Sequence, residues 1–249
     1  HGKIISYLER KGFSFPKNDP FLTLECEGQF GGDLHQHRFF ELSSTQIIHI
    51  KSSGNMVSSG TTGFFLWEGS VAFLALLMEA EQFKAKFSGK RVLELGSGAG
   101  LAGISVAALA QPSAVLLTDV DRVLDAFSAP NCVLHSKLST ISTASLDWCD
   151  YDKLTKLKNE FDIVIGCDLV YDPDVCQLLL EACRLLLKGG QVQEIVFLCT
   201  LRNSETFENF VSELNTFARV TTSHLSLSAS NPIIVTDPSS LRLLTIKVV

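Results

Sequence analysis

The 249-residue sequence predicts an α/β fold in which a parallel sheet carries helices on both faces, preceded by a small β-rich element. From Trp67 onward, short apolar runs alternate with helix-like segments, and this alternation is typical of a parallel sheet. The run at 161–167 is almost entirely apolar, as in strands that are buried on both faces. Residues 1–60 hold short β-like runs divided by Gly and Ser turns. We therefore assign 1–60 to an N-terminal β-rich extension and 61–249 to the main domain.

The individual elements follow from apolar periodicity and from turn residues. In the N-terminal extension we expect short strands at 39–42 and 46–50, followed by a Ser/Gly-rich loop at 52–63. In the main domain we expect helices at 67–87, 101–110, 174–187 and 205–217. We expect its strands at 91–95, 114–118, 143–146, 161–167, 194–199 and 241–249. Because ligands of such sheets bind at the carboxyl ends of the strands, a site is expected at that edge.

Composition argues against several classes of protein. The net charge of −6 disfavours a protein that binds nucleic acid, because such a protein needs a basic face. The seven cysteines form no Cys-x-x-Cys pair, so we expect neither a disulfide framework nor a metal site. The apolar run at 64–78 is shorter than the roughly 20 residues of a membrane span, and the first residues lack the pattern of a secretion signal. We expect a cytoplasmic monomer that contacts neither nucleic acid nor membrane, with the nucleus as the alternative location.

The most specific motif is Glu94-Leu95-Gly96-Ser97-Gly98-Ala99-Gly100, which joins a predicted strand to a predicted helix. Glycines permit a tight turn and let a ligand lie against the backbone, and the helix beyond offers unpaired N–H groups. Dinucleotide folds use Gly-x-Gly-x-x-Gly and place a pyrophosphate there. This chain has Gly-x-Gly-x-Gly with Glu94 two positions earlier, and a carboxylate suits a cationic amino group better. The motif favours S-adenosylmethionine over NAD, and a structural glycine turn is the remaining alternative.

Three further strand ends carry side chains that suit this cofactor. Asp119, about 20 residues beyond the glycines, is placed to accept hydrogen bonds from ribose hydroxyls, or else caps a turn. Trp148 is placed to cover adenine while Asp147 or nearby backbone reads its amino group, with a core tryptophan as the alternative. Asp168 and Tyr171 lie where the methyl group would be transferred, unless Asp168 only caps the next turn. The intervening Leu-Val, in place of Pro-Pro, argues against methylation of nucleic-acid bases.

These motifs resemble those of the seven-β-strand, class I protein methyltransferases, a group with an Asp/Glu-x-x-Tyr/Phe motif after strand four. The resemblance covers about 60–249 and rests on Trp67, Glu94 to Gly100, Thr118-Asp119, Leu146-Asp147-Trp148 and Asp168-Leu169-Val170-Tyr171. It implies a Rossmann-like, seven-stranded methyltransferase sheet, S-adenosylmethionine as cofactor, and methyl transfer to a lysine of a protein substrate. The segments 146–148, 200–206 and 210–214 are most similar to the lysine methyltransferases of translation elongation factor 2, which makes this factor a candidate substrate.

The resemblance also implies roles for the matching positions. Asp168 and Tyr171 would be catalytic and line the lysine channel, with Arg202 near its rim. The cofactor would be held by Trp67, Glu94, Leu95, Gly96, Ser97, Gly98, Gly100, Asp119, Asp147, Trp148 and Cys167. One departure from the family is Pro130, which is expected to break the helix after the second strand. The alternatives are a methyltransferase with another protein or a small molecule as acceptor, an NAD-linked oxidoreductase, and a binding module without catalytic activity.

Overall fold

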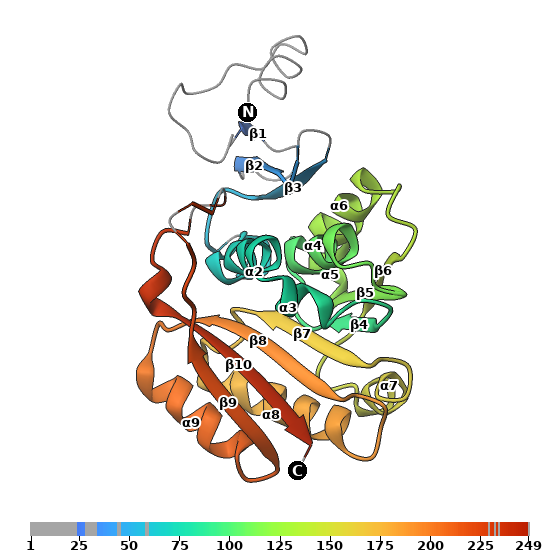
Figure 1. The fold of residues 1–249 in the computed structure, drawn as a ribbon, viewed down its shortest axis with the longest axis vertical. Coiled ribbons are helices and arrows are strands. Elements are labelled where there is room, and N and C mark those ends of the chain that lie inside the picture. Colours follow the sequence, from blue (N-terminus) through green and yellow to red (C-terminus); the bar gives the residue numbers. More distant parts are fainter. Residues whose placement is uncertain are drawn as a thin grey trace.

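The computed structural model describes residues 24–27, 34–43, 46–57, 60–228, 230–231, 233 and 235–248. Its centre is a seven-stranded sheet with the strand order β6-β5-β4-β7-β8-β10-β9 (Figure 1). The strands from β6 to β8 run parallel, and β10 is antiparallel to both of its neighbours. The strands are β4 (Arg91–Glu94), β5 (Ala114–Asp119), β6 (Ile141–Ser145), β7 (Ile163–Cys167), β8 (Glu194–Thr200), β9 (Ala218–His224) and β10 (Leu241–Val248). The sheet confirms the predicted fold class and its seven strands.

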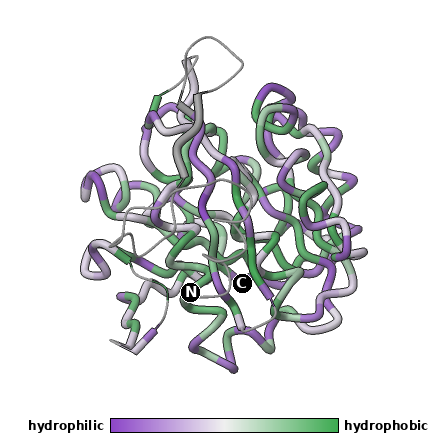
Figure 2. The backbone as a smooth tube through the Cα atoms, turned by 90° about the horizontal axis from the view of Figure 1, so that it is seen from above, coloured by the Kyte–Doolittle hydropathy of each residue, from purple (hydrophilic) through white to green (hydrophobic). Residues whose placement is uncertain are grey.

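Helices cover both faces of this sheet in two layers (Figure 1). One layer comprises α2 (Glu68–Glu79), α3 (Glu81–Ala85), α4 (Leu101–Leu109), α5 (Asp121–Val123), the π-helical turn η1 (Leu124–Ser128) and α6 (Ala129–Leu134). The other comprises α7 (Tyr151–Leu157), α8 (Pro173–Leu187) and α9 (Ser204–Leu214), and the short 3-10 helix η2 (Pro238–Ser240) precedes β10. Side chains alternate along the strands, so Ile163 and Ile165 face the first layer and Val164 the second. Hydrophobic stretches accordingly lie mostly toward the middle of the molecule (Figure 2).

A second sheet of three antiparallel strands lies beside the first helical layer (Figure 1). Its strands are β1 (Leu24–Glu27), β2 (Leu34–Glu41) and β3 (Ile47–Ser53), which confirms the β-rich N-terminal prediction. Phe40 and Ile48 are buried in the same apolar cluster as α2 and α4. The buried Asn131 amide joins this sheet to α6, since it accepts from the Lys51 N–H and donates to the Lys51 and Ala99 carbonyls. Apolar packing and these hydrogen bonds therefore fix the small sheet on the main domain.

Some element boundaries differ from the sequence-based predictions. The helix predicted at 67–87 is divided into α2 and α3 at Ala80, where a ψ of 94° makes the backbone extended. The helix predicted at 205–217 ends at Leu214, and neither α7 nor β9 was predicted. None of the helices in the described part of the chain is long and apolar enough to cross a membrane.

The segment after β5 stays helical from Asp121 to Leu134, so the prediction that Pro130 breaks this helix was wrong. Pro130 follows the π-helical turn inside this continuous helical segment, where the hydrogen-bonding pattern already departs from that of an α-helix, so the proline does not end the helix. At the end of η1, the Ser128 hydroxyl donates to the Gly98 carbonyl at 2.6 Å. The helical segment therefore supports the glycine motif.

Candidate cofactor and active site

A cavity of about 340 Å³ opens at the carboxyl ends of β4 to β8, the edge at which the sequence predicts a site. Most of the predicted residues line it, namely Trp67, Glu94, Gly96, Ser97, Gly98, Asp119, Asp147, Trp148, Cys167, Asp168 and Tyr171. Arg202 also lines the cavity. Leu95 does not, because its side chain is buried between the sheet and the layer of α7 to α9. Gly100 does not either: it begins α4 with a φ of 83°, and a Cβ there would lie 2.8 Å from the Leu117 side chain.

Gly96 and Gly98 of the glycine motif line the cavity with their backbone alone. Gly96 and Gly98 have φ values of 56° and 54°, in the left-handed region that favours glycine. A Cβ on Gly96 would lie 2.6 Å from a methyl carbon of Leu169, and one on Gly98 would lie 3.1 Å from the Gly63 carbonyl oxygen. Side chains at these positions would therefore collide with Leu169 and Gly63, two other residues of the cavity wall, and would change its shape.

Two carboxyl side chains flank this motif, one buried and one half-buried. Glu94 is 2% exposed and accepts one hydrogen bond from the Gly103 N–H at 3.0 Å, while burial raises its pKa to about 8. Asp119 accepts from the N–H groups of Gly98 and Val120 at 2.8 Å each, and burial raises its pKa as well. A ligand with a cationic amino group would offset the desolvation of Glu94. The residues present therefore fit the amino acid end of S-adenosylmethionine.

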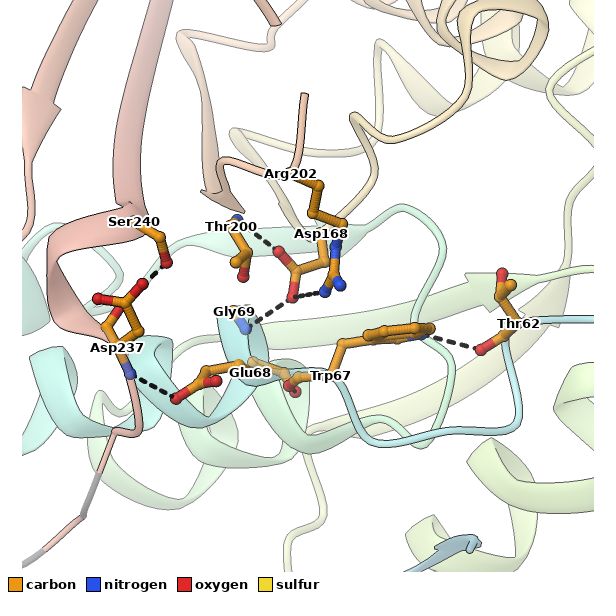
Figure 3. A network of polar contacts seen from close by, with 10 residues as sticks. Thr62, Trp67, Glu68, Gly69, Asp168, Thr200, Arg202, Asp237 and Ser240 are labelled. Carbon is orange, nitrogen blue, oxygen red and sulfur yellow. Dashed lines mark hydrogen bonds and ion pairs between the residues drawn. The ribbon is translucent and has the colours of Figure 1, made fainter. Parts of the chain in front are cut away.

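Asp168 follows β7, the neighbour of β4 in the sheet, and also lines the cavity, where it binds two other elements (Figure 3). Its Oδ2 accepts from the Gly69 N–H in the first turn of α2 at 2.7 Å, and its Oδ1 accepts from the Thr200 N–H at 2.6 Å. The Arg202 guanidinium lies 3.7 Å from Oδ2. Asp168 has a φ of 55°, a conformation that aspartate adopts more readily than most residues. Both oxygens of this carboxylate are thus engaged within the protein.

Trp67 and Arg202 stack at the entrance beside Asp168. The Arg202 Cζ atom lies 4.3 Å from the centre of the Trp67 ring, within the range of a cation–π interaction (Figure 3). The Trp67 indole N–H donates to the Thr62 carbonyl at 2.9 Å, and Phe65 packs edge-on against the ring at 4.9 Å. These contacts fix the Trp67 ring, which lines the cavity as predicted.

The remaining predicted residues differ in exposure. Tyr171 is 41% exposed at the entrance, and Asp147 is exposed with its Oδ1 accepting from the Cys149 N–H. Burial raises the pKa of the Cys167 thiol well above its ordinary value, so this thiol stays protonated and is a poor nucleophile. Among the described residues, no group of three or more His, Cys, Asp or Glu side chains could hold a metal ion.

Sequence reasoning missed part of the cavity wall. Thr61, Thr62 and Gly63 line the cavity, although their segment was predicted only as a connecting loop. Val175 and Leu178 of α8 also line it. Leu178 is 37% exposed, and the only sequence signal was an apolar pair three residues apart near the start of a predicted helix.

A family model described as lysine methyltransferase matches residues 44–217. The chain belongs to this family. It is 32% identical over 194 residues to the human protein-lysine N-methyltransferase EEF2KMT, covering 72% of this chain and 57% of that protein. It is 30% identical over 188 residues to the bovine histidine protein methyltransferase 1 homolog, covering 62% of this chain and 49% of that protein. The chain thus spans about half the length of the curated relatives it matches.

Solved structures share the fold at low identity. The fibrillarin pre-rRNA processing protein of Methanococcus jannaschii has a TM-score of 0.52 at 12% identity, covering 91% of this chain and 97% of that chain. SMU.776, solved in complex with SAH, has a TM-score of 0.53 at 17% identity, covering 81% of this chain and 53% of that chain. These likenesses show the fold alone. The family match confirms the predicted group and, with it, S-adenosylmethionine as the cofactor.

Proposed function

We propose that this chain transfers methyl groups from S-adenosylmethionine to the side-chain amine of a lysine in a protein substrate. The observation that carries the proposal is the combination of buried Glu94 with the backbone of Gly96 and Gly98 in one cavity wall, in a chain of the lysine methyltransferase family. Glu94 would hold the amino group of the cofactor. Asp119 would accept hydrogen bonds from its ribose, and Trp148 would cover its adenine.

When bound, S-adenosylmethionine supplies an electrophilic methyl group on a sulfonium sulfur. The sulfur keeps the electron pair of the broken S–C bond, so S-adenosylhomocysteine is the leaving group. The task of the chain is to bring an uncharged amine into line with that bond, and alignment can be worth about 7–11 kcal/mol. A lysine amine has an ordinary pKa of about 10.4, so it is mostly charged at neutral pH. The apolar side chains of Val175 and Leu178 reduce solvation at the entrance, which favours the neutral amine. Tyr171 is placed there to orient the amine, whose proton leaves to water.

Asp168 and Tyr171 are proposed to serve the acceptor side in different ways. Tyr171 lies at the exposed entrance, where it would touch the incoming lysine. Asp168 lines the cavity, but its two oxygens are engaged by Gly69, Thr200 and Arg202. These contacts favour a positioning role for Asp168 over direct proton transfer.

Translation elongation factor 2 is the proposed substrate. The similarity of 146–148, 200–206 and 210–214 to methyltransferases of this factor supports it, as does the 32% identity with human EEF2KMT. We further propose that the chain acts in the cytoplasm as a monomer without contacting nucleic acid directly, since its net charge is −6. Light scattering of the purified chain would test whether it is a monomer in solution.

The test is transfer from tritiated S-adenosylmethionine by the purified chain into a eukaryotic cell lysate and into purified elongation factor 2. We expect one labelled protein of the size of this factor, labelling that resists ribonuclease, and methyl-lysine in its peptides by mass spectrometry. Label in a different protein would overturn elongation factor 2 as the substrate but leave the proposed methyl transfer standing. No labelled protein with any lysate, or label only in RNA, would overturn the proposal.

Histidine is a second candidate acceptor, because the chain is also 30% identical to the bovine histidine protein methyltransferase 1 homolog. An imidazole is already largely neutral at pH 7.5, since its ordinary pKa is about 6.5. The same mass spectra distinguish methyl-histidine from methyl-lysine. The pH dependence separates them as well, because a lysine acceptor should gain activity well above pH 8 and a histidine acceptor should not.

A further inference from the structure

Arg202 stands out among the charged groups of the cavity wall. Of the described residues that line the cavity, it is the only one with a basic side chain, whereas four have carboxyl side chains: Glu94, Asp119, Asp147 and Asp168. Its guanidinium lies between the face of Trp67 and the Asp168 carboxylate, and its side chain is 38% exposed. A fixed cation therefore occupies the entrance through which a lysine would have to pass.

Without a cation at this entrance, the carboxylates would stabilise the charged form of the lysine amine and so disfavour the neutral form. A carboxylate within about 4–6 Å of an amine stabilises its charged form and raises its pKa. Asp168 is the buried carboxylate on the acceptor side of the cavity, and Asp147 lies across from it after β6. Without another cation, an incoming lysine ammonium would pair with Asp168 and remain protonated.

Arg202 pairs with Asp168 in place of the incoming lysine. Together with the Gly69 and Thr200 N–H groups, it engages both oxygens of Asp168 before any substrate arrives. An arginine stays charged at any physiological pH, and its planar group suits simultaneous stacking and ion pairing. The stack on Trp67, whose indole is held by Thr62, keeps the guanidinium in this place.

We propose that Arg202 is a positioning residue that keeps the target amine uncharged, by occupying Asp168 and by placing a fixed positive charge at the cavity entrance. This inference rests on the proposed lysine methylation. The other titratable groups at the entrance are Tyr171 from the β7–α8 connection and Cys167 from β7. Glu68 in the first turn of α2 is occupied by the Thr236 and Asp237 N–H groups (Figure 3). None of these supplies a cation.

The test compares kcat as a function of pH for three variants and the wild-type chain, with elongation factor 2 or the labelled protein of the lysate as acceptor. Arg202→Gln should move the rising limb of kcat by about one pH unit to higher pH, which is a tenfold loss at pH 7.5. Arg202→Lys keeps the charge but loses the stack that holds it beside Asp168, so its limb should move less than that of Arg202→Gln. Arg184→Gln is the matched control, since Arg184 also stacks on an aromatic ring, Phe217, and pairs with Glu181 but lies outside the cavity.

Two readouts do not depend on transfer. Tryptophan fluorescence of the free chain should change in Arg202→Gln and Arg202→Lys, because both lose the planar stack on Trp67, and it should not change in Arg184→Gln. Calorimetry with S-adenosylhomocysteine should show a change in affinity of less than about threefold for Arg202→Gln.

The outcomes separate the two proposals. An active wild-type chain with an unshifted limb in Arg202→Gln would overturn the role of Arg202 and leave the methylation proposal standing. Unchanged tryptophan fluorescence in both Arg202 variants would show that Arg202 does not stack on Trp67, and the inference would fail. A wild-type chain that methylates no protein would overturn the proposed function, and the role of Arg202 would fall with it.

Discussion

At the β4 end of the cavity, Glu94 is buried, accepts a single N–H hydrogen bond and has a pKa raised by burial, whereas at the β7–β8 end Asp168 meets two N–H groups and a guanidinium. The first end thus carries a buried carboxyl group that a cationic ligand can compensate, and the carboxylate of the second end is compensated from within the chain. Acidic side chains thus have two roles in one cavity: they are available to a ligand at the first end and stabilise the fold at the second. Substitutions should therefore change ligand binding most at the first end and stability most at the second.

Glu94→Gln tests the ligand end and carries the largest expected effect. Removing one partner of a buried charge pair is typically worth about 3–5 kcal/mol, so affinity for S-adenosylhomocysteine should fall at least 100-fold. Calorimetry measures this affinity. The exposed Glu208→Gln is the control and should leave it unchanged. An unchanged affinity in Glu94→Gln would mean that this carboxylate does not face the cofactor.

The same variant has an opposite effect on stability. Burial raises the pKa of Glu94 from an ordinary 4.5 to about 8, so the folded chain holds this proton longer than the unfolded chain. The free energy of unfolding of the cofactor-free wild type should therefore fall as pH rises from about 4.5 to about 8. Glu94→Gln should lose this slope and be the more stable protein at pH 9 in urea unfolding. A steeper slope in the variant would contradict the assignment.

Asp168→Ala tests the internally compensated end. It leaves the buried Gly69 and Thr200 N–H groups without their acceptor, so the free energy of unfolding should fall by about 2–4 kcal/mol. Asp168→Asn keeps one acceptor and tolerates the φ of 55°, so it should lose less. Urea unfolding measures both. If Asp168→Ala abolished transfer without loss of stability, Asp168 would act on the substrate directly, as a catalytic residue.

The two ends also differ in how well the sequence predicts them. The glycine motif and Glu94 are contiguous with the strand before them and the helix after them, so local spacing places them correctly. Asp119 follows because the ends of neighbouring parallel strands meet. The bond from Gly69 to Asp168 spans 99 positions, and no local pattern indicates it. The stack of Arg202 on Trp67 joins residues still farther apart in sequence and needs the assembled sheet.

The elements that escaped prediction have weak apolar patterns. β9 is an edge strand in which only Ala218 is buried, so its sequence lacks the alternation that predicts strands. α7 has seven residues and buries Leu154 alone. The loop that supplies Thr62 and Gly63 to the cavity has the Ser/Gly composition of any surface connection. Its role depends on where β3 and α2 place it.

Gly96→Ala tests whether the open backbone is needed at the ligand end. The new Cβ would lie 2.6 Å from a methyl carbon of Leu169 at a φ of 56°, so stability should fall by about 1–3 kcal/mol and cofactor affinity should fall with it. Gly89→Ala is the matched control, because Gly89 has a φ of 68° but nothing within 4 Å of an added Cβ. It should lose stability without losing affinity. Equal affinity in both variants would show that the packing of Gly96 against Leu169 does not shape the cofactor site.

Tyr171→Phe carries the smallest expected effect and sharpens the comparison at the exposed entrance. Tyr171 is 41% exposed, so loss of its hydroxyl should leave the free energy of unfolding unchanged. If the hydroxyl only orients the amine by a hydrogen bond, kcat should fall by less than about tenfold, since one such bond is worth about 0.5–1.5 kcal/mol. A loss beyond about 100-fold would instead show that Tyr171 takes part in proton transfer. Because Asp168 is occupied by its internal partners, that result would make Tyr171 the group through which the amine proton leaves.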